Sequence, residues 1–479
     1  MWKQIVVFLF IPLAVGAQNA ENSISLTLEE SFRLMNKGNQ TLKIAQEQIS
    51  IAREERQILN SSWFPSLDAS GAYVHLSDKI EVKEPLSQFT DPAKDFIHTI
   101  IPNDEFISSI LDKIGSYSLT FPLLKRNLTT VDASLMCPVF TGGKRVFANK
   151  IGRSMERLAE VNMEQTGATL QTSLVEAYYA VRLAKKVVQV REETYIGMQR
   201  HYQNALKLQD NGMITKAERL FVQVSMDEAK RELESASKEY GVAQQALCTL
   251  LNIQQPVDII TVSSLFINEE LPSEFYFKEL IPVESYPIEL LYHQMELLKN
   301  QLRIHRSAYL PNIALFGKQT FYAKNLPKNL MPRTMIGVGF TWTIFDGWKR
   351  EATIRQTQRS LESLATGREK TINDLGVLVD KLYSEMQNAQ DNVTALNTTI
   401  AMSRELVRIR RKSFQEGMAT STEVIDAETM LSKVQIAFLL AYYQYDVALA
   451  NLLTACGVPD TFWQYARQGK TEDFIFESK

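Results

Sequence analysis

The 479-residue sequence predicts a mixed α and β protein, mostly α-helical, built from two copies of one unit. Three observations predict it: motifs that recur at a fixed separation, long heptad repeats of apolar residues, and short segments in which apolar and polar residues alternate. Hydrophobic residues make up 45% of the chain, and the mean hydropathy is -0.16, which is typical of a folded chain with a sizeable core. The formal net charge of -3 argues against a nucleic-acid-binding protein and against a polybasic membrane-surface protein.

Residues 1–17 have the features of a secretory signal peptide. Lys3 supplies a positive start, residues 5–15 form an apolar stretch, and a small-residue cleavage site ends at Ala17. The apolar stretch is too short to cross a bilayer, which takes about 20 residues. No cysteine directly follows Ala17, so no lipid anchor is expected there. The sequence therefore predicts an exported chain that begins at Gln18.

Beyond the signal peptide the sequence has no run of eighteen apolar residues. The closest candidate, residues 438–457, is interrupted by Gln444, Asp446 and Asn451, so no α-helical membrane span is expected. The three cysteines show no CxxC spacing. We therefore expect them to be small buried residues rather than disulfides or metal ligands.

Three pairs of segments align between the two halves of the chain. They are 139–145 with 344–350 and 211–215 with 416–420, both at an offset of 205, and 63–67 with 309–313 at an offset of 246. The first copy therefore holds 246 − 205 = 41 extra residues, expected within residues 77–125.

The duplication predicts four parts after the signal peptide. They are a first repeat (18–252), a connection (253–287), a second repeat (288–457) and a C-terminal tail (458–479). Four prolines in the connection predict irregular chain rather than a continuing helix. The polar tail is expected to be loosely ordered.

The last part of each repeat predicts a pair of long helices. Apolar residues separated alternately by four and three positions run through residues 222–250, and the positions 205 residues later are apolar too. Residues 372–400 keep the same alternation, and residues 349–415 are expected to stay helical for some 65 residues, about 100 Å. A generic fibrous coiled coil fits the heptads equally well.

Four segments alternate apolar residues with small or polar ones, which predicts strands with one apolar face. They are residues 66–76, 130–139, 311–322 and 335–344. Lys318 and Gln319 weaken the third. Strands of about ten residues fit a tilted transmembrane β-strand better than a soluble sandwich. Four strands cannot close a barrel, so several protomers must share one: two would give a barrel filled by side chains, and three could leave a passage.

Over the whole mature chain the sequence resembles the TolC family of outer-membrane efflux proteins. The resemblance rests on the duplicated order of elements, on an aromatic-x-Pro sequence before the first strand of each copy, and on motifs at the strand-to-helix and helix-to-helix junctions. These motifs are FTGG (140–143), FDG (345–347) and Gly-x-x-Thr (212–215 and 417–420).

The resemblance implies a TolC-like homotrimeric tube. Its twelve-stranded transmembrane β-barrel, with four strands per protomer, would be continued by a long α-helical coiled-coil barrel in the periplasm. The implied location is the outer membrane of a Gram-negative bacterium, in contact with outer-membrane lipid, and the implied partners are a periplasmic adaptor protein and an inner-membrane pump. The chain would be a passive exit duct for efflux or type I secretion. The 41-residue insertion would then be an enlarged extracellular loop.

In this family the two helix-to-helix turns form the periplasmic tip, which closes the tunnel and docks the adaptor. The resemblance therefore assigns adaptor docking to residues of both turns. They are Gly212, Met213, Thr215, Gly417, Met418 and Thr420. The same residue types also suit an ordinary turn, because glycine ends a helix in the left-handed conformation and threonine caps the next helix.

Glu423 and Asp426 match the paired acidic positions that line the constriction of similar proteins. They share one helix face, and a threefold axis would gather six carboxylates into a ring that favours cations. Carboxylates in a first helical turn are also ordinary partners of the helix dipole. Glu218 matches a latch position in the other turn. Phe414 and Ala419 replace the tyrosine and arginine of the best-known latch, whose hydrogen bonds and salt bridge these side chains cannot form.

No catalytic site, metal site or cofactor is expected. The five histidines show no HExxH motif, and the glycines at 142 and 143 lack the spacing of a phosphate loop.

Two other interpretations of the whole chain remain: a soluble periplasmic coiled-coil structural or adaptor protein, and, more remotely, an exported hydrolase. The apolar strand face that carries Phe340, Trp342 and Ile344 argues against a soluble β domain.

Overall fold

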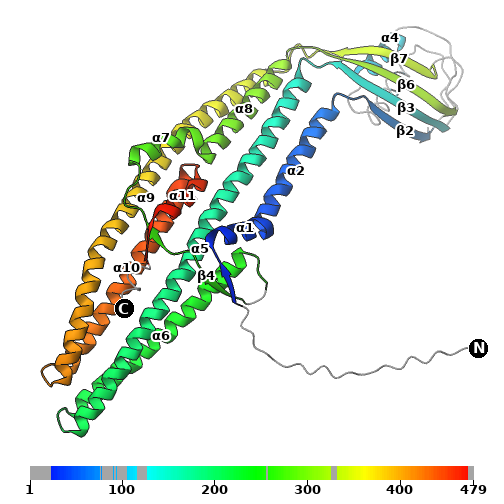
Figure 1. Cartoon of the computed structure of the whole chain (residues 1–479). Helices are drawn as coiled ribbons and strands as arrows, with labels where there is room; N and C mark the ends of the chain where they lie inside the picture. The colour runs from blue at the N-terminus through cyan, green and yellow to red at the C-terminus, as the bar shows by residue number, and fades with distance from the viewer. Residues whose placement is uncertain are drawn as a thin grey trace, which may run out of the picture. The chain divides into compact units, whose positions relative to one another are not determined.

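The computed structural model describes residues 23–75, 77, 90, 93, 105–115, 127–254, 257–324 and 332–472. The predicted signal peptide and most of the predicted extracellular loop lie outside these residues. The chain divides into two units (Figure 1). The first combines residues 1–46, 162–289 and 370–479, and the second combines residues 47–161 and 290–369. Each unit thus draws on both repeats.

Helices occupy most of the described residues. They are α1 (Leu28–Gly38), α2 (Gln40–Ser61), α4 (Glu105–Gly115), α5 (Lys144–Asp210), α6 (Lys216–Leu250), α7 (Glu274–Glu284), α8 (Tyr286–Ser307), α9 (Lys349–Gln415), α10 (Ser421–Ala455) and α11 (Phe462–Gln468). The two repeats match in length, because α5 and α9 each have 67 residues and α6 and α10 each have 35. The prediction of an unbroken helix over residues 349–415 is confirmed.

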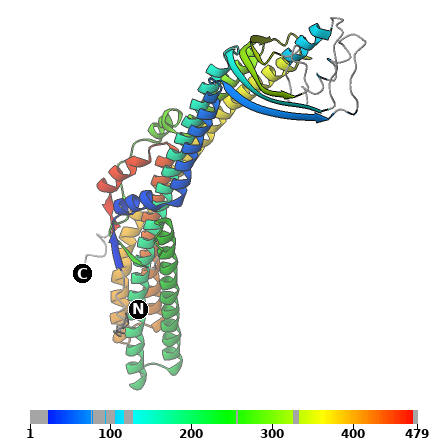
Figure 2. The same ribbon diagram turned by 90° about the vertical axis from the view of Figure 1, so that its right-hand side faces the viewer.

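In the first unit the second half of α5 runs beside α6, and the second half of α9 beside α10 (Figures 1 and 2). The predicted apolar seam of α10 is buried: Ala427, Phe438, Tyr445 and Leu452 are at most 4% exposed. Among the described helices, α10 alone has the length and hydropathy to cross a membrane, but 61% of its most apolar window is buried inside the protein. This burial is typical of a core helix.

The second unit contains a four-stranded antiparallel sheet in the order β2-β3-β6-β7. Its strands are β2 (Ser66–His75), β3 (Asn127–Phe140), β6 (Asn312–Lys324) and β7 (Thr334–Thr341). Each repeat supplies one hairpin, and the pairing of β3 with β6 joins the two.

The prediction of the fourth strand, residues 335–344, was wrong at its C-terminal end. It stops at Thr341 because Arg350 donates hydrogen bonds to the carbonyls of Thr343 and Ile344, each at 2.8 Å.

The two faces of this sheet differ in polarity, as the alternation predicts. On one face Ile336, Val338 and Phe340 are 84%, 62% and 74% exposed. On the other face, the Asp132 carboxylate accepts a hydrogen bond from Thr320 Oγ1 at 2.6 Å. It also forms an ion pair with Lys318, at 3.1 Å. The lysine that weakened the sequence pattern therefore lies on the polar face, where a carboxylate neutralises it.

The connection between the repeats is more ordered than predicted. It contains β4 (Asp258–Thr261), β5 (Phe266–Ile267) and α7, and β4 pairs in parallel with β1 (Ser23–Leu26). The tail expected to be loose is also ordered as far as residue 472, through the 3-10 helix η1 (Pro459–Thr461), α11 and the strand β8 (Lys470–Thr471), which pairs with β5. The reason is burial: Phe462 is 1% exposed and packs against Phe266, with ring centroids 5.6 Å apart.

A buried polar cluster fixes the end of this tail. Arg182 donates to Glu472 Oε1 at 2.8 Å, to the carbonyl of Thr261 at 3.1 Å and to Ser264 Oγ at 3.0 Å. Glu472 and Asp446 are both fully buried. Burial raises the pKa of the Asp446 carboxyl well above its ordinary value; the backbone N–H of Phe266 opposes this, and the Glu472 carboxylate adds to it.

Candidate functional site

The two helix turns have the same backbone geometry. Gly212 and Gly417 take φ of 70° and 73°, the left-handed conformation that glycine adopts without strain. The N–H groups of Met213 and Met418 donate to carbonyls five residues back, at Leu208 and Ser413, each at 2.8 Å. Each turn is thus a Schellman motif that ends one long helix. A threonine then begins the next helix in both turns, as the sequence predicts.

The acidic residue at the start of the second helix has a different partner in each turn. Glu218 accepts a hydrogen bond from the Thr215 backbone N–H at 2.9 Å, while Thr215 Oγ1 accepts from the Glu218 N–H at 3.2 Å. This is a complete capping box. Glu423 occupies the equivalent position, but its carboxylate forms an ion pair with Arg410 of α9. Only the Glu423 N–H bonds to the capping residue, Thr420, at 3.4 Å.

A small apolar core lies beneath both turns. Its buried members are Ala205, Val222, Phe414 and Val424, one from each long helix. Ala419 and Ile214 pack against them from the two turns. The turns also approach each other, because Met213 Cε lies 3.6 Å from the position that a Cβ on Gly417 would take. The predicted docking residues are therefore brought together at one end of the first unit.

The predicted latch positions lie in different surroundings. Phe414 is 2% exposed and stacks edge to face with His201, with ring centroids 4.5 Å apart. The Glu218 carboxylate is engaged in the capping box with Thr215. In the predicted acidic ring, Glu423 is partly exposed and paired with Arg410, whereas Asp426 is exposed and has no ion pair among the described residues. The two acidic residues are therefore not electrostatically equivalent.

A buried ionic cluster close to the turns was not predicted from the sequence. Arg411 of α9 pairs with Glu428 of α10, whose side chain is 4% exposed against 42% for the arginine. Gly197 of α5 leaves room for this pair, since a Cβ there would lie 2.8 Å from an Arg411 nitrogen. His201 of α5 is 5% exposed. Burial, together with the positive charge of Arg411, lowers the pKa of His201 to about 4, while the backbone of Ser421 opposes the shift.

The heptad pattern does not predict this cluster, because it marks only apolar positions. Glu428 lies off the apolar seam, so the sequence predicts an exposed surface residue. In the structure it is buried between α10 and its neighbours and pairs with Arg411 of α9. The available signals were the helical glycine at 197 and the adjacent arginines at 410 and 411. The pair holds α9 to α10 within one hairpin. The His201–Phe414 contact joins that hairpin to α5.

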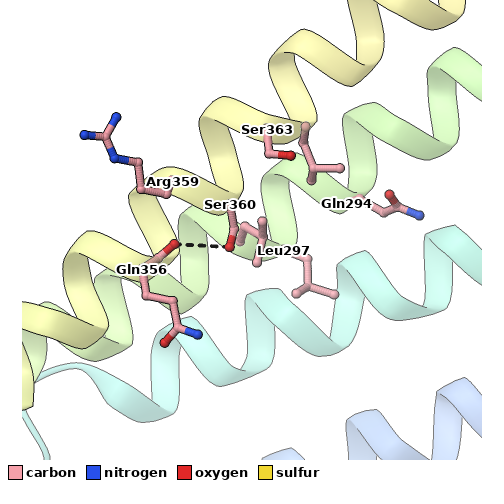
Figure 3. Close-up of a pocket in the computed structure, with 8 residues that line it drawn as sticks. Gln294, Leu297, Gln356, Arg359, Ser360 and Ser363 are labelled. Carbon is pink, nitrogen blue, oxygen red and sulfur yellow. Dashed lines mark hydrogen bonds between the residues drawn. The ribbon is translucent and has the colours of Figure 1, made fainter.

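The second unit has a groove between α8 and α9 (Figure 3). Leu297, Leu298 and Leu364 supply its apolar surface, and it is open to solvent on one side. Ser360 is occupied by a hydrogen bond to the carbonyl of Gln356 at 3.1 Å, and Arg359 pairs with Glu362 at 2.7 Å, pointing away from the groove (Figure 3). This arrangement lacks the convergent polar groups of a small-molecule site.

Comparisons with known proteins relate this arrangement to export. The chain is 20% identical to the alkaline protease secretion protein AprF of Pseudomonas aeruginosa, over 64% of this chain and 66% of that protein, slightly less than two thirds of its length. It is 20% identical to the probable outer membrane lipoprotein SilC of Salmonella typhimurium, over 88% of this chain and 83% of that protein. A crystal structure of CusC superposes with a TM-score of 0.71 at 16% identity, covering 90% of this chain and 92% of that one, and so shares the fold.

The sequence profile of one family matches more than half of the chain. The profile of the outer membrane efflux proteins covers residues 125–252 and 291–458. The first range contains β3, α5 and α6, and the second contains most of α8 together with β6, β7, α9 and α10, so both repeats match. This confirms the resemblance that the duplicated motifs carry. The chain belongs to the outer membrane efflux protein family.

Proposed function

We propose that three copies of this chain form one exit duct. Three four-stranded sheets would close a twelve-stranded barrel in the outer membrane, and the long helices would form a periplasmic tunnel. Its partners would be a periplasmic adaptor and an inner-membrane pump. The observation that carries this proposal is the four-stranded sheet, which has an exposed apolar face and leaves β2 and β7 each paired on one side only among the described residues. Unpaired edges in lipid cost several kcal/mol per backbone group, so the sheet needs further copies.

Three copies suit a duct better than two. Eight strands give a barrel that side chains fill, whereas twelve leave room for a passage. The polar face of the sheet, which carries the Asp132–Lys318 pair, would line that passage, and the apolar face would contact lipid. A soluble coiled-coil adaptor, the alternative interpretation, leaves both the sheet edges and the exposed Ile336 and Phe340 unexplained.

The two adjacent turns are the proposed docking surface for the adaptor. Met213 and Met418 are 60% and 70% exposed although both are apolar, and the Schellman motifs hold their backbones in place. Flexible methionine side chains are well suited to contact a partner protein. AprF is named for protease secretion, and SilC as an outer membrane lipoprotein. The cargo of this chain would be set by its pump.

We further propose that Asp426, more than Glu423, supplies the negative charge of the tunnel constriction. The Arg410 guanidinium neutralises Glu423, whereas Asp426 has no ion pair among the described residues. The prediction concerns single-channel recordings in planar bilayers with a multivalent cation added on the tip side. Asp426→Asn should weaken block strongly, Glu423→Gln should weaken it little, and Arg410→Gln should strengthen it because it frees the Glu423 carboxylate.

The same recordings test the duct itself. Wild-type protein purified from outer membranes should show discrete conductance steps. Absence of any conductance, with the protein recovered in the soluble periplasmic fraction, would refute the duct. Conductance with unchanged block in both acidic variants would refute only the ring. Lys216→Gln, at an exposed position one residue after the Thr215 cap, is a matched control for loss of a charge near the tip.

A further inference from the structure

The core of the first unit contains a carboxyl group that the proposed duct does not use. Asp446 of α10 is fully buried. Its Oδ2 accepts a hydrogen bond from the backbone N–H of Phe266 at 3.3 Å, whereas its Oδ1 is buried and has no hydrogen-bond partner among the described residues. An ionised carboxylate in this position loses its hydration and gains one donor only, which is strongly unfavourable. A neutral carboxylic acid avoids most of that cost.

A second buried carboxyl group lies close to the first. Glu472, at the end of β8, is also fully buried, and its Oε1 accepts a hydrogen bond from Arg182 Nε at 2.8 Å. Burial raises the pKa of the Asp446 carboxyl, and the negative charge of Glu472 raises it further, while the N–H of Phe266 opposes the shift. Two buried carboxyl groups thus share one guanidinium. One retained proton would make this cluster electrically neutral.

Aromatic rings enclose the cluster. The ring of Phe266 contacts those of Tyr179, Tyr445 and Phe462, with centroids 6.4, 6.2 and 5.6 Å apart. Burial raises the pKa of the Tyr179 and Tyr445 phenols, and burial with the two carboxylates raises that of Tyr442 to about 12. These phenols therefore stay neutral below about pH 10, so a titration in that range belongs to the carboxyl groups. The other charged or titratable groups around the cluster are Tyr178 and Arg182 of α5, Tyr383 of α9 and Tyr465 of α11.

The Asp446 carboxyl is linked to the C-terminal tail through β5. Phe266, whose N–H bonds to Asp446, lies opposite Thr471 in the pairing of β5 with β8. The tail also packs on its ring, because a Cβ on Gly469 would lie 2.4 Å from a Phe266 ring carbon. Water reaches the Asp446 carboxyl most readily when this short tail moves aside, since the other walls are long helices. Docking of the tail and ionisation of Asp446 therefore oppose each other.

We propose that Asp446 binds a proton while the tail is docked, and that loss of this proton at higher pH releases β8 from β5. Residues 469–472 then act as a proton-operated clamp on the connection between the repeats, to which β5 belongs. The clamp goes beyond the proposed duct, because it requires neither a trimer nor a partner protein.

The direction of the pH effect follows from the raised pKa of the Asp446 carboxyl. With the tail released, the hydrated carboxyl has the ordinary aspartate pKa of about 3.9. The stabilising effect of the proton on docking is complete below that value, and it is lost as the pH rises through the raised pKa of the docked state. Because opening releases one proton, the fraction of released tails should rise about tenfold per pH unit between the two pKa values.

Limited trypsin digestion of the full-length protein, purified from outer membranes in detergent, tests the clamp. Lys470 lies in β8 with an exposed side chain, so cleavage after it depends on β8 leaving β5. Mass spectrometry follows release of the peptide 471–479. Its rate, divided by the rate for Asp446→Asn at the same pH, should rise about tenfold per pH unit, and the division removes the pH dependence of trypsin. Asp227→Asn, at an exposed position of α6, is the matched control and should follow the wild type.

Infrared spectroscopy of the same samples tests the bound proton. At neutral pH the wild type should show the carbonyl stretch of a protonated carboxylic acid, and Asp446→Asn should lack it. Absence of this band from the wild type would overturn the bound proton, and a cleavage ratio that does not change with pH would overturn the clamp. If Asp446→Asn loses its helical circular dichroism, the wild type alone decides, with trypsin calibrated on a peptide substrate. Its infrared band must then disappear over the pH range in which cleavage accelerates, and a mismatch would refute the coupling.

Discussion

Gly457→Ala is expected to disrupt the packing of the end of α10 against α7 and to lower the free energy of unfolding by about 4 kcal/mol or more. Gly457 takes φ of +82°, and a Cβ there would lie 2.0 Å from the carbonyl oxygen and 2.4 Å from the carbonyl carbon of Glu284. Both are backbone atoms, so no side-chain rotation can relieve the overlap. The measurement is the thermal midpoint of the helical circular dichroism signal of the purified protein.

Two other glycines provide matched controls for this substitution. Gly212 and Gly417 end α5 and α9 at φ of +70° and +73°, with no atom within 4 Å of a Cβ at the first and only Met213 Cε, at 3.6 Å, near the second. Alanine at either position should cost only backbone strain, about 1–2 kcal/mol. If all three variants lost the same stability, the steric explanation for Gly457 would be wrong.

Arg182→Met should have the second largest effect, a loss of about 3–5 kcal/mol, because it removes the Arg182 guanidinium from the buried Glu472 carboxylate. Glu472 is fully buried, and the Arg182 side chain is 15% exposed. The change also removes the donors to Thr261 and Ser264 that hold the connection between the repeats. We expect β8 to leave β5. Limited proteolysis of the C-terminal residues, together with the unfolding midpoint, measures both effects.

The double variant Arg182→Met with Glu472→Gln separates the effect of the lost arginine charge from the effect of its lost packing. It should recover a large part of the lost stability, because the remaining amide is neutral. Arg359→Met is the control for loss of an arginine: its ion pair with Glu362 is 82% and 65% exposed, so the midpoint should not change. A double variant as unstable as Arg182→Met alone would show that the guanidinium acts through packing rather than through its charge.

Much of this fold follows from local sequence patterns. Heptads and turn glycines predict α9 to the residue, because the helix begins within the motif at 344–350 and ends just before a Schellman glycine. Alternation predicts all four strands of the sheet. It could not place the end of β7, which depends on the Arg350 hydrogen bonds to nearby carbonyls. Nor could it interpret Lys318, whose partner, Asp132, lies on a strand far away in the sequence.

The burial of two ion pairs between helices could not be predicted from the sequence, for a different reason. Glu428 and Glu472 are charged, and charged residues are ordinarily exposed. They are buried here because Arg411 and Arg182 approach from other helices. The candidate site shows the same limit: the sequence places Glu423 and Asp426 on one helix face, but only the structure shows that Arg410 pairs with the first.

The proposed duct requires three chains to share one channel. Native mass spectrometry of the complex, extracted from outer membranes in detergent, counts the chains directly. The expected result is a complex of three mature chains. A complex with two chains, or a single chain that already shows channel conductance, would contradict it.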